Sequence, residues 1–352
     1  MYNFMLAEQR RRYETGEKHM SAFDMNKYVT VLKKMDEYSW LREVNSHSLY
    51  RACADVARAY DNFFKKRSKY PRFKSRKRSR SNYPLCDGAG NVWFSEQYVQ
   101  IPTIGKVRYK TDFDLPQGRG HKFSNPRISN RNGKWFLSFG MECENQAPAL
   151  NDYSVGIDLG IKETAVVAYG DEQLVFHNIN KSKKARQLKK RMKHLQRSIS
   201  RKYEANKQGN TFVKTNNIAR QEGKLRKMYA RLTGIRMNYI HQMTHQIVML
   251  LPYRVVMEDL NVQGMMKNRH LSRAIQEQCF AEIIRQMRYK SEWNGIEFIQ
   301  ADRFYPSSKT CSHCGCIHKV LKLKDRIFVC PECGFTIDRD YQAALNLSRY
   351  AA

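Results

Sequence analysis

The sequence predicts a multi-domain α/β protein, and three features of the pattern support this fold class. Apolar residues recur at helical spacing up to residue 64, whereas short β-rich segments separated by glycine and proline fill residues 84 to 148. From residue 151 onward, apolar strands alternate with long amphipathic helices. The length of 352 residues allows more than one buried core. Two or three domains in series are therefore expected.

The net charge points to a polyanionic partner. Lysine and arginine together number 63 against 33 acidic residues, which gives a formal net charge of +30. A globular chain with this surplus repels itself unless a polyanion neutralises it, and nucleic acid does so through its phosphates, with release of counterions. The alternatives are a charge excess that serves only solubility, or attraction to an anionic membrane surface.

No segment of the sequence is typical of export or of a membrane span. The apolar runs fall short of the roughly 20 residues that cross a bilayer. The first 13 residues lack the positive, apolar and small order of a secretory signal. We therefore expect an intracellular, cytoplasmic protein without a membrane partner.

A basic segment follows the helical region 1–64. Residues 65 to 80 carry ten lysines and arginines and no acid, and aromatic residues and Pro71 interrupt them. Such a run is often only a solvated face, but cations interleaved with aromatic rings on a non-helical segment favour contact with phosphates and bases. The residues expected to bind nucleic acid here are Lys65, Lys66, Arg67, Tyr70, Arg72, Phe73 and Lys74.

The region 65–150 is expected to form a β-rich module. Its short strands are separated by turns that contain glycine or proline, which is typical of a small β-barrel. Residues 145–152, which include Pro148, are a candidate boundary at the end of this module.

Two helices in the region 151–302 are expected to form a basic hairpin. The first lies in residues 181–202, which hold eleven lysines and arginines and no acid, and the second runs from about residue 218 to residue 251. A solvated surface is the alternative, but the cationic length of the first helix favours contact with nucleic acid. The expected contact residues are Lys189, Lys190, Arg197 and Arg201.

Two acidic residues occupy strands where a charge is costly. Asp158 lies in the apolar strand Val155–Gly160, and Glu258 ends the apolar strand that begins at Tyr253. A carboxylate among apolar neighbours is unfavourable unless it is paired or binds a metal ion. Both residues are therefore candidate metal ligands.

A third acid, Asp340, directly precedes the helical stretch 341–349. Two-metal nucleases use clustered carboxylates, because Mg²⁺ prefers hard oxygen ligands and a pair of ions clamps the attacking and leaving oxygens of a phosphodiester. Strand ends and a helix start can converge at one edge of a sheet. The alternative for each acid alone is a surface ion pair or a helix cap, and Asp338 or Asp340 could cap the final helix.

Four cysteines form the most specific local motif. They occur as two C-x₂-C pairs with fifteen residues between the pairs: Cys311, Cys314, Cys330 and Cys333. Each pair presents two thiolates from one tight turn, and two such turns complete a tetrahedral Zn²⁺ site that is structural, because no position is left for water. A redox-active pair is the other interpretation. The alternative ligands are His313, Cys316 and His318.

Four motifs, in this order, resemble those of TnpB, the OrfB-type protein that transposons encode and that is related to type V CRISPR effectors. The motifs are Val155–Gly160, Val256–Asn261, Tyr305–Gly315 and Asp338–Asn346. The segment Tyr70–Lys74 and the β-rich module also resemble the N-terminal half of that family. The resemblance therefore covers nearly the whole chain.

The resemblance implies an RNA-guided DNA endonuclease with an RNase H-like (RuvC) nuclease domain that acts by two-metal hydrolysis. It implies Mg²⁺ (or Mn²⁺) and Zn²⁺ as cofactors, guide RNA and a double-stranded DNA target as partners, and the prokaryotic cytoplasm, at the nucleoid, as the location. The implied divisions are a helical recognition-like region at 1–64, a wedge-like barrel module at 65–150, the nuclease domain with its basic hairpin at 151–302, an inserted zinc ribbon at 303–335, and the final RuvC motif and helix at 336–352.

The resemblance also implies roles for single residues. Asp158 matches the first RuvC aspartate and Glu258 the glutamate of the second motif. The catalytic aspartate of the third motif maps to Asp340 rather than to Asp338, and the four cysteines match the zinc ribbon that binds target nucleic acid. Two departures are Gln342, where the family usually has asparagine, and a start without the family's customary opening strand. A nuclease-inactive RNA-guided repressor, a transposase accessory protein and a structural zinc- and RNA-binding protein are the alternative functions.

Overall fold

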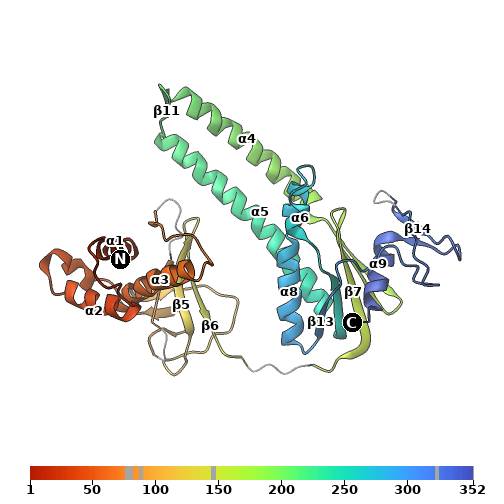
Figure 1. Cartoon of the computed structure of the whole chain (residues 1–352), viewed down its shortest axis with the longest axis horizontal. Helices are drawn as coiled ribbons and strands as arrows, with labels where there is room; N and C mark the ends of the chain where they lie inside the picture. The colour runs from red at the N-terminus through yellow and green to blue at the C-terminus, as the bar shows by residue number, and fades with distance from the viewer. Residues whose placement is uncertain (76–81, 87–89, 144–147, 322–324, 352) are drawn as a thin grey trace. The chain divides into compact units, whose positions relative to one another are not determined.

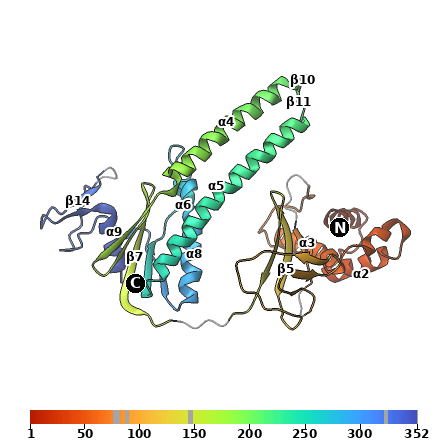
Figure 2. The same ribbon diagram turned by 180° about the vertical axis from the view of Figure 1, so that it is seen from behind.

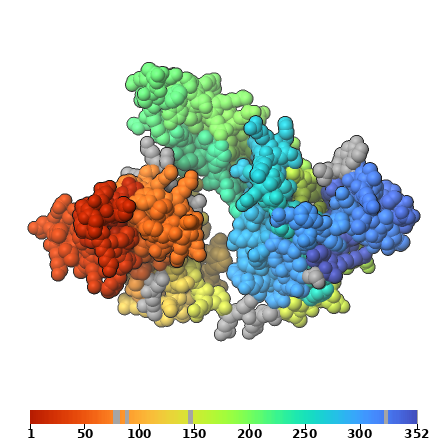
Figure 3. Space-filling model, viewed as in Figure 1, coloured from red at the N-terminus to blue at the C-terminus, as the bar shows by residue number. Residues whose placement is uncertain are grey.

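A computed structural model describes the chain except for residues 76–81, 87–89, 144–147, 322–324 and 352. The chain divides into two compact units, Met1–Cys143 and Glu144–Ala352, which run from red to yellow and from yellow-green to blue in Figure 1. Figure 2 shows the ribbon from behind, and Figure 3 shows the space-filling surface. Each unit has its own apolar core and is described by itself.

Helices fill most of residues 1–64. They are α1 (Tyr2–Glu14), α2 (Ala22–Leu32), the 3-10 helix η1 (Asp36–Arg42) and α3 (Ser46–Phe64). A capping box begins α2, because the Ser21 hydroxyl accepts the N–H of Asp24 while the Asp24 carboxylate accepts the N–H of Ser21. The buried core of this bundle includes Met5, Leu6, Met25, Val29, Cys53 and Val56.

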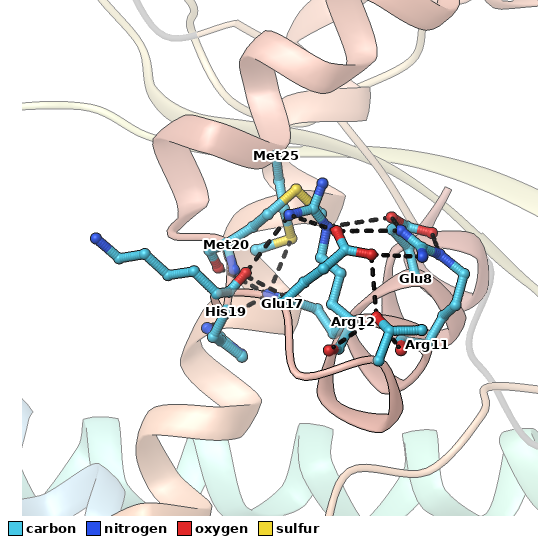
Figure 4. A network of polar contacts seen from close by, with 10 residues as sticks. Glu8, Arg11, Arg12, Glu17, His19, Met20 and Met25 are labelled. Carbon is cyan, nitrogen blue, oxygen red and sulfur yellow. Dashed lines mark hydrogen bonds and ion pairs between the residues drawn. The ribbon is translucent and has the colours of Figure 1, made fainter.

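A polar network closes the turn between α1 and α2 (Figure 4). The buried amide of Gln9 donates to the carbonyl oxygen of Met20 at 2.7 Å and accepts the N–H of Met20 at 3.0 Å. Arg11 pairs with both Glu8 and Glu17 at 2.7 Å on the exposed side. Exposed ion pairs contribute little, so the buried amide is what fixes this turn.

Two antiparallel sheets follow in unit 1. One has the order β1-β5-β6, with β1 (Asn82–Pro84), β5 (Ser124–Arg131) and β6 (Lys134–Gly140). The other has the order β2-β3-β4, with β2 (Trp93–Phe94), β3 (Tyr98–Ile101) and β4 (Gly105–Arg108). Both sheets contribute to one core, which includes Leu85, Phe94, Val99, Phe123 and Phe139.

The barrel expected for residues 65–150 is wrong for the part of this region that the structure describes. The sheets share side-chain packing, but no ladder of paired strands joins one to the other there. The physical reason is strand length, since β1 to β4 hold only two to four residues each before a turn interrupts them. Such short strands leave too few hydrogen bonds to close a barrel.

The centre of unit 2 is a five-stranded mixed sheet with the order β13-β12-β7-β8-β9. Its strands are β7 (Asn151–Leu159), β8 (Glu163–Tyr169), β9 (Glu172–His177), β12 (Pro252–Glu258) and β13 (Glu297–Ala301). Strands β7, β12 and β13 run parallel, whereas β7, β8 and β9 form an antiparallel meander.

Two long helices project from this sheet as a hairpin, which is green in Figures 1 and 2. They are α4 (Lys183–Ala205), which follows the 3-10 helix η2 (Ile179–Lys181), and α5 (Asn216–Val248). The strands β10 (Lys207–Gln208) and β11 (Thr211–Phe212) close the tip. The two helices predicted from apolar spacing are therefore confirmed.

The remaining elements follow β12. They are α6 (Val262–Met265), α7 (Ser272–Gln278), α8 (Phe280–Trp293), β14 (Ile327–Val329), β15 (Thr336–Asp338) and α9 (Arg339–Ser348). Across the residues that the structure describes, no helix is both long enough and apolar enough to cross a membrane.

The alternation of strand residues assigns the two faces of the sheet. Val155 and Val255 pack in one large core with residues of α5 and α8. The residues next to Val155 and Val255 in each strand point to the opposite face of the sheet, because successive strand residues face opposite sides. On that opposite face, Val166 packs with Ala344 of α9, and Val256 packs with Leu347 of α9. The sheet therefore lies between the α5–α8 layer and α9.

Candidate metal sites

Asp158 and Glu258 lie next to each other at the ends of two parallel strands. The paired register of β7 and β12 ends with Ile157 opposite Met257, and the next residue of each strand is the acid. Neighbouring strands are about 4.8 Å apart, and in-register residues point to the same face. Because Ile157 and Met257 belong to the α5–α8 core, both carboxylates are on the α9 face.

The third acid reaches this edge of the sheet at the start of α9. Asp338 caps the helix, because its carboxylate accepts the N–H groups of Asp340 and Tyr341 at 2.9 and 3.1 Å. Asp340 is in the first turn, where the positive end of the helix dipole favours a carboxylate. The helix can approach the sheet closely because Gly156, two residues before Asp158, has no Cβ.

The pKa of Asp158 is shifted by burial and by neighbouring negative charges. The pKa of Asp158 is well above its ordinary value, first because the carboxyl group is buried and then because of the charges on Glu258 and Asp340. Arg339 acts in the opposite direction. The three carboxylates are thus close enough to interact, and a divalent cation is the partner that would offset their mutual repulsion.

The other two acids are held by residues of the segment 303–335. The buried hydroxyl of Ser307 donates to Oε1 of Glu258. A guanidinium nitrogen of Arg326 lies 3.6 Å from Oδ2 of Asp340. The segment that carries the cysteines therefore also contacts the edge of the sheet where the acids meet.

Among the described histidine, cysteine and acidic residues, the four cysteines are the group whose ligand atoms all lie within 4.8 Å of one another, and the three carboxylates do not form a second such group. A pair of ions about 3.5–4 Å apart needs a wider ligand set than a single ion does.

The four cysteine sulfurs have the geometry of a tetrahedral site. The sulfurs of Cys311 and Cys333 are 3.8 Å apart, and those of Cys314 and Cys330 are 3.5 Å apart. Four sulfurs at about 2.3 Å from a shared zinc ion would be about 3.8 Å from one another. The backbone N–H of Cys333 donates to the Cys330 sulfur and lowers the pKa of that thiol to about 6. The cluster is therefore compatible with Zn²⁺.

The alternative ligands have other roles. The ring of His313 stacks on Phe335 at 5.6 Å, and the ring of His318 meets Phe328 edge-on at 6.0 Å. The carbonyl oxygen of Cys316 accepts the N–H of Cys311 at 2.8 Å. The sulfur of Cys316 is outside the group of four that meet within 4.8 Å.

Comparison with known proteins gives the family. Residues 138–269 match the family model OrfB_IS605, described as "Probable transposase", and residues 280–347 match the Cas12f1-like TNB domain. The chain is 32% identical to a "Putative RNA-guided DNA endonuclease" of Streptomyces pristinaespiralis, over 99% of this chain and 82% of that protein. The chain belongs to the TnpB (OrfB) family. It is also 29% identical to the "Putative RNA-guided DNA endonuclease InsQ" of Escherichia coli K12, over 99% of this chain and 85% of that protein.

A solved structure shares the fold of this TnpB-family chain. The structure is that of a Cas12f1–sgRNA–target DNA complex, and its protein matches with a TM-score of 0.57 at 16% sequence identity. The match covers 99% of this chain and 79% of the Cas12f1 chain. At this level of identity, the similarity is one of fold.

Several residues that are expected to bind nucleic acid in the basic segment also contact the helical bundle of the same chain. The guanidinium of Arg10 lies 5.3 Å from the centroid of the Tyr70 ring and 4.6 Å from that of Phe73, and it donates to the carbonyl oxygen of Pro71 at 3.1 Å. Lys74 lies over the Tyr2 ring at 3.8 Å. These contacts pin the segment to α1, so both rings have a partner within the protein.

The other residues of that segment face solvent. Lys65, Lys66, Arg67 and Arg72 are exposed, as are Lys69, Tyr70, Phe73 and Lys74. The basic stretch from residue 76 to residue 80 lies outside the described residues. In this TnpB-family chain, five exposed cations of the segment, Lys65, Lys66, Arg67, Lys69 and Arg72, are therefore open to solvent.

On the hairpin, the four expected contact residues divide into two groups. Lys190, Arg197 and Arg201 are exposed on α4, and the last two line a surface hollow with Lys193, His194 and Ser200. Lys189 differs, because its ammonium pairs with Glu277 of α7 at 2.6 Å and its side chain is 22% exposed. Lys189 therefore anchors the base of the hairpin to α7.

Sequence reasoning missed a group of polar residues that join α9 to the cysteine segment. Gln342 is fully buried, donates to the carbonyl oxygen of Thr310 and accepts from the Ser312 hydroxyl at 2.9 Å. Ser307, which contacts Glu258, had no assigned role although it lies in one of the family motifs. The sequence offered only one indication of this contact, which is that polar residues cluster in segments whose pattern otherwise predicts burial. No single residue indicated the contact by itself.

Proposed function

We propose that this chain is a transposon-encoded, RNA-guided DNA endonuclease that hydrolyses phosphodiester bonds in a double-stranded DNA target. The observation that carries the proposal is the convergence of Asp158, Glu258 and Asp340 on one edge of a mixed sheet, in a chain of the TnpB family. We infer that the sheet with α5, α8 and α9 is an RNase H-like (RuvC) nuclease domain, and that residues 303–335 form its inserted zinc ribbon.

The three carboxylates fit a hard divalent cation. Their oxygens are the ligands that Mg²⁺ and Mn²⁺ prefer. The raised pKa of Asp158 reflects first its desolvation and then the negative charges of Glu258 and Asp340, which Arg339 opposes. When bound there, Mg²⁺ would activate a water and neutralise charge on the phosphodiester oxygens. We propose Asp158, Glu258 and Asp340 as its ligands.

The chain itself would contribute the positions of those ligands. Asp158 is fixed by the ladder of β7, and Asp340 by the first turn of α9 below the Asp338 cap. The Ser307 hydroxyl orients Glu258. Such fixed placement matters, because a misplacement of about 1 Å can cost on the order of 100-fold in rate.

The partners proposed are a guide RNA and a double-stranded DNA target. Two relatives carry the name "Putative RNA-guided DNA endonuclease", and the structural neighbour is a complex with sgRNA and target DNA. The exposed cations of α4, and separately those of the segment around Arg72, would bind backbone phosphates. Such contacts hold an RNA–DNA heteroduplex without reading its sequence.

The test begins with the RNA that copurifies with the full chain. Sequencing should return one dominant species, and a plasmid that matches its variable end should be cut in the presence of Mg²⁺. Asp158→Ala should retain the RNA and lose cutting. Cutting by the Asp158→Ala protein would contradict the assigned site, and binding of target without cutting by the natural chain would support a nuclease-inactive repressor instead.

A further inference from the structure

We propose that Ser307 is a positioning residue for Glu258, and that the first zinc-binding turn holds Ser307 in place, so that the two metal sites are coupled. This inference rests on the proposed function. The Ser307 side chain is only 2% exposed, and its hydroxyl donates to one oxygen of the Glu258 carboxylate, Oε1. A buried hydroxyl in this position fixes the orientation of the carboxylate and leaves Oε2 to face a cation.

The backbone of Ser307 is itself held by α9. The side-chain amide of Asn346, which is 4% exposed, donates to the carbonyl oxygens of both Ser307 and Thr310 at 2.6 Å. The hydroxyl and N–H of Thr310 donate to the carbonyl oxygen of Pro306 at 2.9 and 3.0 Å. Residues 306–310 thus form one closed turn, and the side-chain amide of Asn346 binds this turn at both Ser307 and Thr310.

This turn continues directly into the zinc site. Thr310 precedes the ligand Cys311, and Ser312 lies between the first two cysteine ligands. Gln342 joins both residues to α9, because its amide donates to the Thr310 carbonyl oxygen while its oxygen accepts from the Ser312 hydroxyl at 2.9 Å. Arg349, at the end of α9, donates to the carbonyl oxygen of Ser312 at 2.7 Å.

A continuous path of hydrogen bonds therefore connects the two sites. It runs from the turn that carries Cys311 and Cys314, through Gln342 and Asn346 of α9, to Ser307 and so to Glu258. The same helix begins with Asp340. Cys311 and Cys314 would hold zinc from this turn, and their bonds to the ion would keep the turn in place. Loss of zinc should therefore loosen the positions of two of the three carboxylates. The cysteine segment would then organise the nuclease centre as well as any surface that it presents to nucleic acid.

The test measures binding of Mn²⁺ to the full chain from the electron paramagnetic resonance signal of the free ion. Ser307→Ala should raise the Mn²⁺ dissociation constant by about 10- to 100-fold, the usual effect of removing a residue that orients a metal ligand. Ser307→Thr, which keeps the hydroxyl, should recover most of the affinity. Zinc content should remain one per chain in both variants, which shows that the zinc site is intact.

Ser291→Ala is the matched control. Ser291 is also fully buried in unit 2, and its hydroxyl has no hydrogen-bond partner among the described residues. The control should bind Mn²⁺ as the natural chain does. Equal Mn²⁺ affinity of Ser307→Ala and the natural chain would overturn the positioning role, as would an equal loss in the Ser291→Ala control.

Two further variants test the coupling. Cys311→Ser combined with Cys314→Ser should lose zinc and weaken Mn²⁺ binding, and Gln342→Ala should weaken Mn²⁺ binding while keeping all four zinc ligands. Unchanged Mn²⁺ affinity in the Gln342→Ala variant would overturn the coupling even if the cysteine variant failed to fold. Asp158→Asn separates this inference from the proposed function, because Mn²⁺ binding that survives Asp158→Asn would contradict the carboxylate site itself.

Discussion

Gly156 of β7 lies directly beneath the carbonyl oxygen of Ala344 in α9, so closely that a Cβ on Gly156 would overlap that oxygen. The contact sets how near the helix comes to the strand. Asp158 follows two residues later on β7, and Asp340 lies one turn before Ala344 on α9. A glycine without direct chemical function therefore determines whether the first and third acids can meet.

Gly156→Ala should destabilise unit 2 and separate the acids. The added methyl group meets backbone atoms of Ala344 and Ser348, which cannot move aside as a flexible side chain could. We expect the free energy of unfolding to fall by about 3 kcal/mol or more. Chemical denaturation measures this.

Gly234→Ala is the matched control for that experiment. Gly234 lies within α5, and a Cβ there would meet no atom within 4 Å. Alanine is the better helix former, so the free energy of unfolding should rise by about 0.5–1 kcal/mol. A similar loss of stability at both glycines would show that the approach of α9 to β7 is not what Gly156 provides.

Asp158→Asn should stabilise the metal-free protein at neutral pH. A carboxyl group whose pKa is raised in the folded state binds its proton more tightly there than in the unfolded chain. The folded state therefore loses stability as the pH rises from the ordinary value of 3.8 through the raised pKa. Relative to the natural chain, Asp158→Asn should therefore gain free energy of unfolding near pH 7, and the gain should disappear as the pH falls toward 3.8.

The measurement is denaturation at several pH values, with zinc retained and no other divalent cation present. Added Mg²⁺ should stabilise the natural chain and leave Asp158→Asn nearly unchanged. Parallel pH profiles for the two proteins would be inconsistent with a raised pKa at Asp158.

Zinc should depend on the four clustered cysteines and not on the fifth cysteine of the segment. In native mass spectrometry the natural chain should carry one zinc ion, and Cys330→Ser should lose it, since a site left with three thiolates is open to water and binds zinc more weakly. Cys316→Ser should retain it, because the Cys316 sulfur is outside the cluster. Loss of zinc in the Cys316→Ser protein would reverse the ligand assignment.

The two kinds of basic residue on α4 should behave differently. Replacing Arg197 and Arg201 together by alanine should weaken RNA binding and lower the slope of log affinity against log salt by about 1.4–1.8, with little change in stability. Lys189→Ala should mainly lower thermal stability, because it removes a partner from the half-buried Glu277. An unchanged salt slope in the double variant would exclude these arginines as phosphate contacts.

How far the sequence predicts this molecule depends on how local each feature is. The zinc cluster could be predicted because its spacing is set within two short turns. The two strand acids could be recognised because a carboxylate in an apolar strand is unfavourable, yet their adjacency required the β7–β12 register, which joins residues about one hundred positions apart.

Other features were not accessible from the sequence. A barrel was expected from strand-like segments, but local pattern does not say which strands pair with which. Tyr70 and Phe73 were expected to contact nucleic acid, and that stays a prediction, but composition does not show that Arg10 lies over both rings. Ser307 was overlooked because a serine gains meaning only from its partner, and Glu258 is far away in the chain.

The central claim is that Asp158, Glu258 and Asp340 form one divalent-cation site, and locating the ion tests it most directly. Crystals of the full chain grown with Mn²⁺ should show anomalous scattering peaks among the three carboxylates, separate from the zinc peak at the four cysteines. In Asp158→Asn crystals the manganese peaks should vanish and the zinc peak should persist. Manganese bound elsewhere, or bound equally well without the Asp158 carboxylate, would contradict the account.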